Sequence, residues 1–266
     1  MPGVAILVDL ANIHLGLKYY YLNPPPYDRL AQIINDYGAN LGDIRVRKVY
    51  TDWNDSRLEW IARQFSSAGF RAEQVTRKAS GKDRTDICLS LDALELFNDE
   101  PELDTLVLAA GDADYVEIMQ RLRQKGKRLF VITLEKNFAP ELLPHLTGNT
   151  ILEKELASLG LSLIPYEPYL QLLYGLQQFH HSKPNGFVAV KLYMRKMEEL
   201  GLTQLISAVI VLSKLLESKV VTTYQVSNPQ NPDWPTSAIQ LNWENEVVKN
   251  YCRNRSLNFL EQEKSL

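Results

Sequence analysis

The sequence has few cysteines, no long apolar run and no excess of positive charge. Its two cysteines, Cys88 and Cys252, lie far apart, so nothing in their spacing indicates a disulfide framework. No segment approaches the ~20 apolar residues that a transmembrane helix needs. In a signal peptide a basic segment precedes the apolar run, and no basic segment precedes the first apolar run here. We therefore expect a cytoplasmic protein that does not associate with a membrane.

Several common nucleotide-handling classes also lack their signatures here. Neither G-x-G-x-x-G nor G-x-x-x-x-G-K-[ST] is present, which excludes the usual dinucleotide and P-loop sites. A haloacid dehalogenase phosphatase needs a second acid just after its first-strand Asp, but Asp9 is followed by Leu10 and Ala11. The net charge of −3 neither indicates nor excludes a polyanionic partner.

The first 160 residues alternate strand-like and helix-like segments. The strand-like segments are short and strongly apolar, which is typical of parallel sheets buried on both faces. The predicted strands are Val4–Val8, Ile44–Tyr50, Phe70–Val75, Thr105–Ala109 and Arg128–Thr133. The intervening segments have apolar residues at helical spacing. The pattern predicts an α/β domain of three layers, α/β/α, with a mainly parallel sheet over residues 1–160.

Residues 166–256 have a different pattern and predict a smaller, second α+β domain. Helical segments are expected at Tyr169–His181, Val188–Leu200, Thr203–Ser218 and Glu244–Arg255. Two strand-like segments, Lys219–Val226 and Ser237–Trp243, stand between the last two helices. This order is typical of a winged helix-turn-helix, but it also suits a helix-rich packing or dimerisation domain. Both interpretations stay open, as does a homodimer.

Acidic residues stand at three predicted strand-to-helix junctions: Asp9, Asp86, Asp112 and Asp114. In open α/β sheets ligands bind beyond the carboxyl ends of the strands, and crowded carboxylates attract hard divalent cations such as Mg²⁺ or Mn²⁺. Taken singly, Asp9 and Asp112 also suit the N-cap of the helix that follows each of them. The joint pattern favours a metal site for phosphate chemistry.

Three segments together resemble the NYN domain family, which has a PIN-like fold. VAILVDLANIH is similar to its opening strand with D-x-x-N, and KDRTDICLSLDAL to its K-G-x-D-x-x-L-x-x-D-A segment. LVLAAGDADYVEIMQRLRQKGKRLFVI is similar to its S-G-D-S-D-F run. The segments occur in this order, and the bacterial LabA-like branch is the nearest in pattern.

The resemblance implies a metal-dependent ribonuclease that hydrolyses RNA phosphodiester bonds with Mg²⁺ or Mn²⁺. The matched positions give four catalytic and metal-binding residues: Asp9, Asp86, Asp112 and Asp114. Asn12 matches the family asparagine, and with the basic residues Lys82 and Arg84 it is predicted to bind the substrate. Asp92 matches a further family acid, which we expect to support the site without binding metal.

The sequence departs from the family pattern at the acidic pair. Ala110 and Ala113 replace small hydroxyl residues, which removes two hydrogen bonds that could orient metal ligands. Tyr115 replaces the usual Phe, a change that we expect to be mild. These departures support a second hypothesis, a non-catalytic regulatory protein that keeps the fold and binds RNA or a protein partner.

Overall fold

The computed structural model describes residues 1–56, 58–76, 84–181, 186–227 and 235–255. The chain divides into two compact units. The first unit comprises residues 1–17 and 23–163, and the second comprises residues 18–22 and 164–266. Lys82, which the sequence predicts to bind substrate, lies outside the described residues.

The first unit is built on a six-stranded sheet within the described residues. All its neighbouring strands are parallel, and their order is β3-β2-β1-β4-β5-β6. The strands are β1 (Gly3–Asp9), β2 (Asp43–Thr51), β3 (Arg71–Gln74), β4 (Leu103–Ala109), β5 (Arg128–Thr133) and β6 (Gly148–Ile151). All the strands end at the same end of the sheet, which we call its carboxyl edge. Since β1 and β4 are the central strands, their ends lie in the middle of this carboxyl edge.

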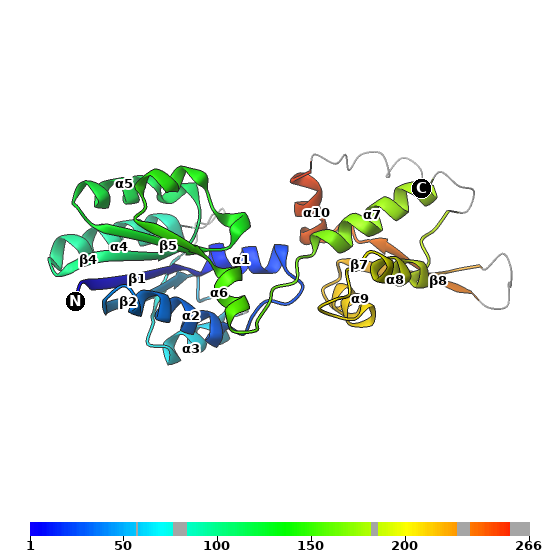
Figure 1. The fold of residues 1–266 in the computed structure, drawn as a ribbon, viewed down its shortest axis with the longest axis horizontal. Helices are drawn as coiled ribbons and strands as arrows, with labels where there is room; N and C mark the ends of the chain where they lie inside the picture. Colours follow the sequence, from blue (N-terminus) through cyan, green and yellow to red (C-terminus); the bar gives the residue numbers. More distant parts are fainter. Residues whose placement is uncertain (57, 77–83, 182–185, 228–234, 256–266) are drawn as a thin grey trace. The chain divides into compact units, whose positions relative to one another are not determined.

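Helices cover both faces of this sheet (Figure 1). The α-helices of the unit are α1 (Leu10–Tyr20), α2 (Tyr27–Ala39), α3 (Glu59–Ser67), α4 (Thr85–Asp99), α5 (Val116–Gln124) and α6 (Leu152–Ser158). Its described residues also form the short 3₁₀ helices η1 (Ala113–Tyr115), η2 (Glu135–Asn137) and η3 (Pro140–His145). In Figure 1, α4 and α5 lie over one face of the sheet, and α2, α3 and α6 lie over the other. The predicted three-layer α/β/α fold, PIN-like in type, is confirmed.

The burial of each strand follows from its sequence. Every residue of β1 is buried, as its unbroken apolar run GVAILV requires of a strand at the centre of a covered sheet. β2 alternates Ile, Val and Val with charged residues and is partly exposed near its start. Helix α2 buries Leu30, Ile33 and Ile34, which share one helical face at a spacing of three to four residues.

The described residues of the second unit form four helices and two strands. The elements are α7 (Glu167–His181), α8 (Val190–Glu199), α9 (Ala208–Glu217), β7 (Val221–Val226), β8 (Thr236–Leu241) and α10 (Glu246–Arg253). β7 and β8 pair in an antiparallel ladder, and an isolated bridge joins Ala189 to Ala238. Each predicted helix and strand of this part corresponds to one of these elements. The winged-helix assignment stays a prediction.

One apolar core holds the second unit together. It contains Tyr193 and Met197 of α8 and Val211 and Leu215 of α9. The fully buried Tyr193 hydroxyl donates to the backbone oxygen of Tyr169 on α7 at 3.0 Å, so its polar atom has a partner inside the core. Among the described helices of the chain, none combines the length and the apolar character that a bilayer span requires.

Candidate functional site

The carboxyl ends of β1 and β4 bring two of the predicted acidic segments together. Val8 of β1 pairs with Ala109 of β4, so Asp9, the last residue of β1, lies beside the turn that follows β4. Asp112 belongs to this turn as the N-cap of η1. Parallel strands place the start of each following segment at the same sheet edge. Asp9 and Asp112 are therefore neighbours in space although about a hundred residues separate them in the sequence.

Asp9 is a buried acid whose two oxygens each accept a hydrogen bond. Asp9 is only 6% exposed to solvent. Oδ1 accepts the backbone N–H of Asn12 at 3.0 Å, so Asp9 caps α1 as the alternative interpretation predicted. Oδ2 accepts the hydroxyl of Tyr115 at 2.7 Å. Each bond that Asp9 accepts occupies one lone pair of one oxygen, and a carboxylate has about four lone-pair sites.

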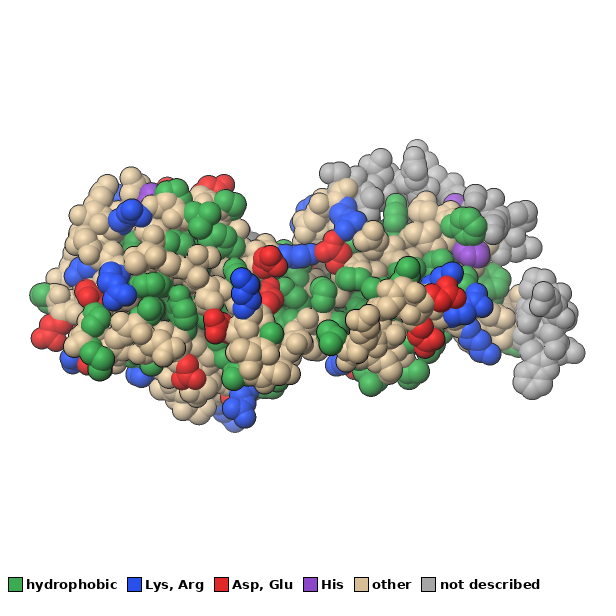
Figure 2. Space-filling model, viewed as in Figure 1, with side chains coloured by type: hydrophobic (Ala, Val, Ile, Leu, Met, Phe, Trp, Pro, Cys, Tyr) green, Lys and Arg blue, Asp and Glu red, His purple; other side chains and the backbone are tan. Residues whose placement is uncertain are grey.

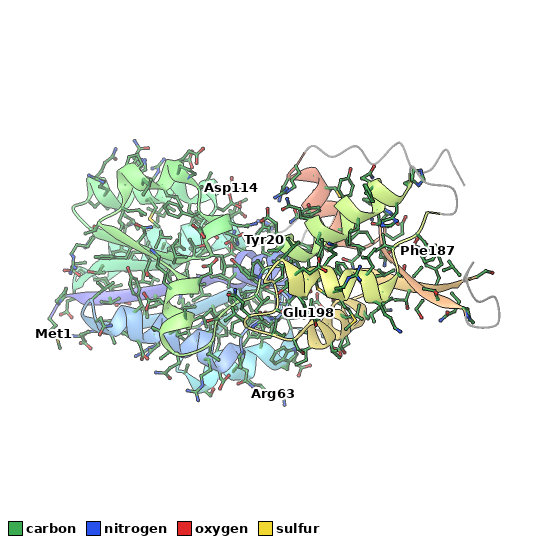
Figure 3. All side chains as sticks on the ribbon, turned by 45° about the vertical axis from the view of Figure 1, so that its right-hand side comes forward. Met1, Tyr20, Arg63, Asp114, Phe187 and Glu198 are labelled. Atoms are coloured by element: carbon green, nitrogen blue, oxygen red, sulfur yellow. The ribbon has the colours of Figure 1, made fainter. Side chains whose placement is uncertain are left out.

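Asp112 and Asp114 occupy one short turn. Asp112 Oδ1 accepts the backbone N–H of Asp114 at 3.3 Å, so Asp112 also caps a helix, although this helix begins with 3₁₀ geometry before α5 starts at Val116. Both acids are exposed. Figure 3 shows Asp114 at the end of the first unit that is opposite to Met1. The turn therefore presents acidic side chains to solvent beside the buried Asp9.

Asp86 is the remaining acid of the four that the sequence predicts for this site. It lies in the first turn of α4, which also begins at this end of the sheet. Burial, and then the negative charges of Asp9, Asp86 and Asp112, raise the pKa of Tyr115 well above its ordinary value. The hydroxyl therefore stays protonated and acts as a donor. Of the four predicted acids, Asp9 bonds directly to the phenol oxygen, and Asp114 is tied to Asp112 through its backbone N–H.

Tyr115 is a residue whose importance the sequence prediction missed. Its replacement of Phe was expected to be mild, but its hydroxyl makes a direct bond to Asp9. The sequence carries no local signal for this bond, because Asp9 lies 106 positions earlier in the chain.

Asn12 links α1 to the two neighbouring loops. Its side-chain oxygen accepts the Gly111 backbone N–H at 3.3 Å and the Asn137 Nδ2 at 3.3 Å. Asn137 Nδ2 also donates to the Asn12 backbone oxygen at 2.9 Å. Asn137 follows β5 as Asp9 ends β1 and Asp112 follows β4. The strand order β1-β4-β5 would have pointed to it, but that order is not written in the sequence.

The predicted basic contacts are only partly described. Arg84 is the N-cap of α4 and is exposed, two residues before Asp86. On the face drawn in Figure 2, the described Lys and Arg side chains (blue) and Asp and Glu side chains (red) are interspersed within each unit. That face carries no continuous basic field among its described residues, in keeping with the net charge of −3.

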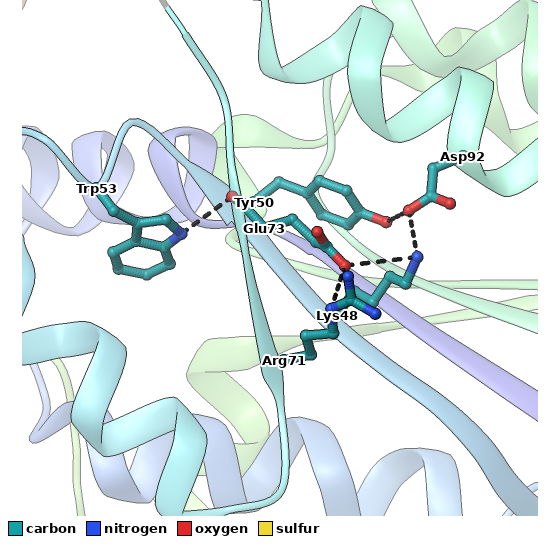
Figure 4. A network of polar contacts seen from close by, with 6 residues as sticks. All are labelled: Lys48, Tyr50, Trp53, Arg71, Glu73 and Asp92. Atoms are coloured by element: carbon teal, nitrogen blue, oxygen red, sulfur yellow. Dashed lines mark hydrogen bonds and ion pairs between the residues drawn. The ribbon is translucent and has the colours of Figure 1, made fainter.

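Asp92 takes part in a separate polar network on β2 and β3, drawn in Figure 4. Its Oδ2 accepts the hydroxyl of Tyr50 and lies 2.7 Å from the Lys48 ammonium. Lys48 also lies 3.5 Å from Glu73 Oε1. Burial, followed by the hydrogen bond and the charge of Asp92, raises the pKa of Tyr50 above its ordinary value. In this structure Asp92 ties α4 to β2.

The chemistry of these carboxylate donors suits a hard divalent cation. Carboxylate oxygens are the ligands that Mg²⁺ prefers, and Mg²⁺ often binds through one or two carboxylates while it keeps several waters. Within the part of the chain that the structure describes, no three His, Cys, Asp or Glu residues form a group able to hold a metal ion. A Mg²⁺ or Mn²⁺ ion at these carboxylates would therefore be held by one or two of them and by several waters.

Comparisons with known proteins find a similar curated protein, a similar solved structure and a matching family model. The "Uncharacterized protein MJ0482" of Methanocaldococcus jannaschii is 29% identical over 142 residues, which are 52% of this chain and 50% of that protein. This chain thus matches about half the length of that relative. The crystal structure of a protein of unknown function, VPA0982 from Vibrio parahaemolyticus RIMD 2210633, covers 58% of this chain and is itself 94% covered, with a TM-score of 0.49 and 20% identity.

The model of the NYN domain matches residues 3–149, more than half of the 266 residues. The matched span contains all three motif segments and the acidic residues at the ends of β1 and β4. The chain belongs to the NYN domain family.

Proposed function

We propose that this protein is a metal-dependent ribonuclease that hydrolyses RNA phosphodiester bonds at the carboxyl edge of its first unit. The observation that carries this proposal is that Asp9 lies beside the turn of Asp112 and Asp114, brought there by the pairing of β1 with β4 and by the hydrogen bond from Tyr115 to Asp9. Membership of the NYN family, whose fold is that of PIN-like nucleases, supports it.

The acidic residues would hold the cation, directly or through water: Asp9, Asp86, Asp112 and Asp114. When bound, Mg²⁺ or Mn²⁺ supplies a Lewis acid for the phosphate and lowers the pKa of a water nucleophile. Asp9 offers a fixed carboxylate, since two protein donors hold its oxygens. The exposed Asp112 and Asp114 offer groups that solvent and substrate can reach.

Asn12 and Arg84 have supporting roles in this proposal. Asn12 holds the turn at Gly111 in place, so its first effect is on the position of Asp112. Arg84, at the start of α4, would bind a substrate phosphate, together with Lys82. Each Lys or Arg side chain that neutralises a phosphate makes RNA binding more dependent on salt concentration.

The proposal is tested by cleavage of single-stranded RNA with Mn²⁺ by the wild-type chain and by Asp112→Asn. We expect the substitution to abolish Mn²⁺-dependent cleavage, because it removes one negative charge and leaves the turn intact. Asp43→Asn is the matched control, since Asp43 is the first residue of β2 and lies at the end of the sheet opposite to the carboxyl ends of the strands. Retained cleavage in Asp112→Asn would count against the proposal, as would no metal-dependent cleavage by the wild type.

A second candidate is a regulatory protein that uses the second unit to bind a protein partner. It is supported by the exposed surface of α9 and its preceding loop, where Leu205, Val209 and Ile210 are 76%, 64% and 49% exposed. A helix that reads nucleic acid needs basic and polar side chains on its outer face, whereas contiguous apolar exposure is typical of protein contacts. Wild-type protein that cleaves none of the RNAs tested, with any divalent cation, would favour this candidate.

A further inference from the structure

The Tyr115 side chain joins the acidic turn to the central strand. Tyr115 ends η1 directly after Asp114 and is fully buried. Its hydroxyl reaches Asp9, 106 positions earlier in the chain, at 2.7 Å. This bond therefore connects the segment that carries Asp112 and Asp114 to the end of β1.

The hydroxyl does more than fill space. A phenylalanine would occupy nearly the same volume, so the difference between the two residues is one O–H donor. The acceptor is a buried carboxylate, and a hydrogen bond to an ionised group is shorter and stronger than one between neutral groups. Because Asp9 Oδ1 is already held by the Asn12 backbone N–H, the Tyr115 bond to Oδ2 fixes the rotation of the carboxylate plane.

We propose that Tyr115 is a positioning residue that orients the Asp9 carboxylate and so sets the affinity of the site for Mg²⁺ or Mn²⁺. The inference rests on the proposed function to the extent that Asp9 binds the cation. Tyr115 does not itself touch the cation. Groups that hydrogen-bond to metal ligands change affinity by roughly 10- to 100-fold when they are removed.

The test is a Mn²⁺ titration of the full chain followed by the electron paramagnetic resonance signal of free Mn²⁺. Wild type is compared with Tyr115→Phe. There are two matched controls, and each removes the hydroxyl of a different buried tyrosine. Tyr50→Phe loses a bond to an acid outside the site, Asp92, and Tyr193→Phe loses a bond to a backbone oxygen in the second unit. We expect Tyr115→Phe to weaken Mn²⁺ binding by about 10-fold or more, and the controls to bind as wild type does.

A second measurement needs no substitution. In wild-type protein with ¹³C at the tyrosine ζ carbon, saturating Mg²⁺ should shift the Tyr115 resonance, because the cation draws charge from the carboxylate that accepts its hydrogen bond. The Tyr50 and Tyr193 resonances should not move. This measurement decides the matter if Tyr115→Phe fails to fold.

The outcomes separate the inference from the proposed function. Weaker Mn²⁺ binding by Tyr115→Phe in a protein that cleaves no RNA would support the inference and oppose the ribonuclease. Equal Mn²⁺ affinities of wild type and Tyr115→Phe, or a Tyr115 resonance that Mg²⁺ does not shift, would overturn the inference. Neither result would count against the proposed ribonuclease function. Wild type that binds no Mn²⁺ would overturn both.

Discussion

The side-chain oxygen of Asn12 accepts the backbone N–H of Gly111 at 3.3 Å, across 99 positions of the chain. Asn12 lies in the first turn of α1, three residues after Asp9, and Gly111 precedes Asp112. This contact therefore joins the two strand ends that carry the predicted acids. It is a structural role, and it accounts for an asparagine at this position whether or not the side chain also contacts a substrate.

We expect Asn12→Ala to destabilise the first unit by about 1 kcal/mol, the usual net value of one hydrogen bond. Asn137 keeps its bond to the Asn12 backbone oxygen, so the loss falls on the Gly111 turn. Urea unfolding followed by tryptophan fluorescence measures it. Asn149→Ala, in an exposed position on the edge strand β6, serves as control. Equal midpoints for Asn12→Ala and wild type would show that the contact contributes nothing.

Substitution of Gly111 should be costly for reasons of space. A Cβ at this position would lie 2.5 Å from the Asn137 backbone oxygen and 2.7 Å from Thr133 Oγ1. Gly111 is not among the glycines with positive φ, so the requirement is room for the neighbouring backbone. We expect Gly111→Ala to cost about 1–3 kcal/mol through overpacking.

Gly175→Ala is the matched control for Gly111→Ala. Gly175 lies within α7, and a Cβ there would meet nothing within 4 Å. Alanine should therefore stabilise α7 by about 0.5–1 kcal/mol. Thermal melts of the two variants should shift in opposite directions. A shift of the same sign for both would contradict the assignment of Gly111 to a close contact.

Asp92→Asn should affect stability and leave metal binding unchanged. The substitution removes the charge that faces Lys48 and weakens the bond from Tyr50. Since both ion-pair partners are partly exposed and Lys48 retains Glu73, we expect a loss of only about 1–2 kcal/mol. Denaturant unfolding and a Mn²⁺ titration check the two halves of this prediction. A drop in Mn²⁺ affinity as large as that in Asp112→Asn would instead make Asp92 part of the metal site.

The outer face of α9 should tolerate charge. Val209 and Ile210 are exposed, whereas the adjacent Val211 is fully buried in the core of the second unit. We expect the pair Val209→Glu and Ile210→Glu to change the free energy of unfolding by no more than about 0.5 kcal/mol each. Val211→Glu should unfold the second unit, because it buries an unpaired charge. Circular dichroism melts distinguish them, and a fall in melting temperature for the outer pair comparable to that of Val211→Glu would mean that the face is covered in the native protein.

Much of the fold is predictable because its signals are local. The apolar run of β1 predicts a central strand, and the observed β5 has the predicted bounds Arg128–Thr133. Asp9 and Asp112 were predicted to share one edge, since parallel strands that each end near an acid bring those acids to the same side.

The parts that the sequence does not predict are contacts between distant segments. The bond from Tyr115 to Asp9 depends on how the start of α5 packs against β1, and the Asn137 contact depends on β5 lying beside β4. The 3₁₀ geometry at the start of the helix after Asp112 is also not predicted from the sequence, although Asp112 caps this helix as expected. Three residues there form a 3₁₀ turn before α5, because the Asp112 cap bonds to Asp114, two residues on, and tightens the first turn.

Anomalous diffraction from crystals soaked in Mn²⁺ tests the central claim most directly. We predict a manganese peak at the carboxyl edge of β1 and β4, with oxygens of Asp9 or of the Asp112 turn about 2 Å away and waters completing the coordination. A crystal with this edge open to solvent and no manganese peak near these acids would contradict the account.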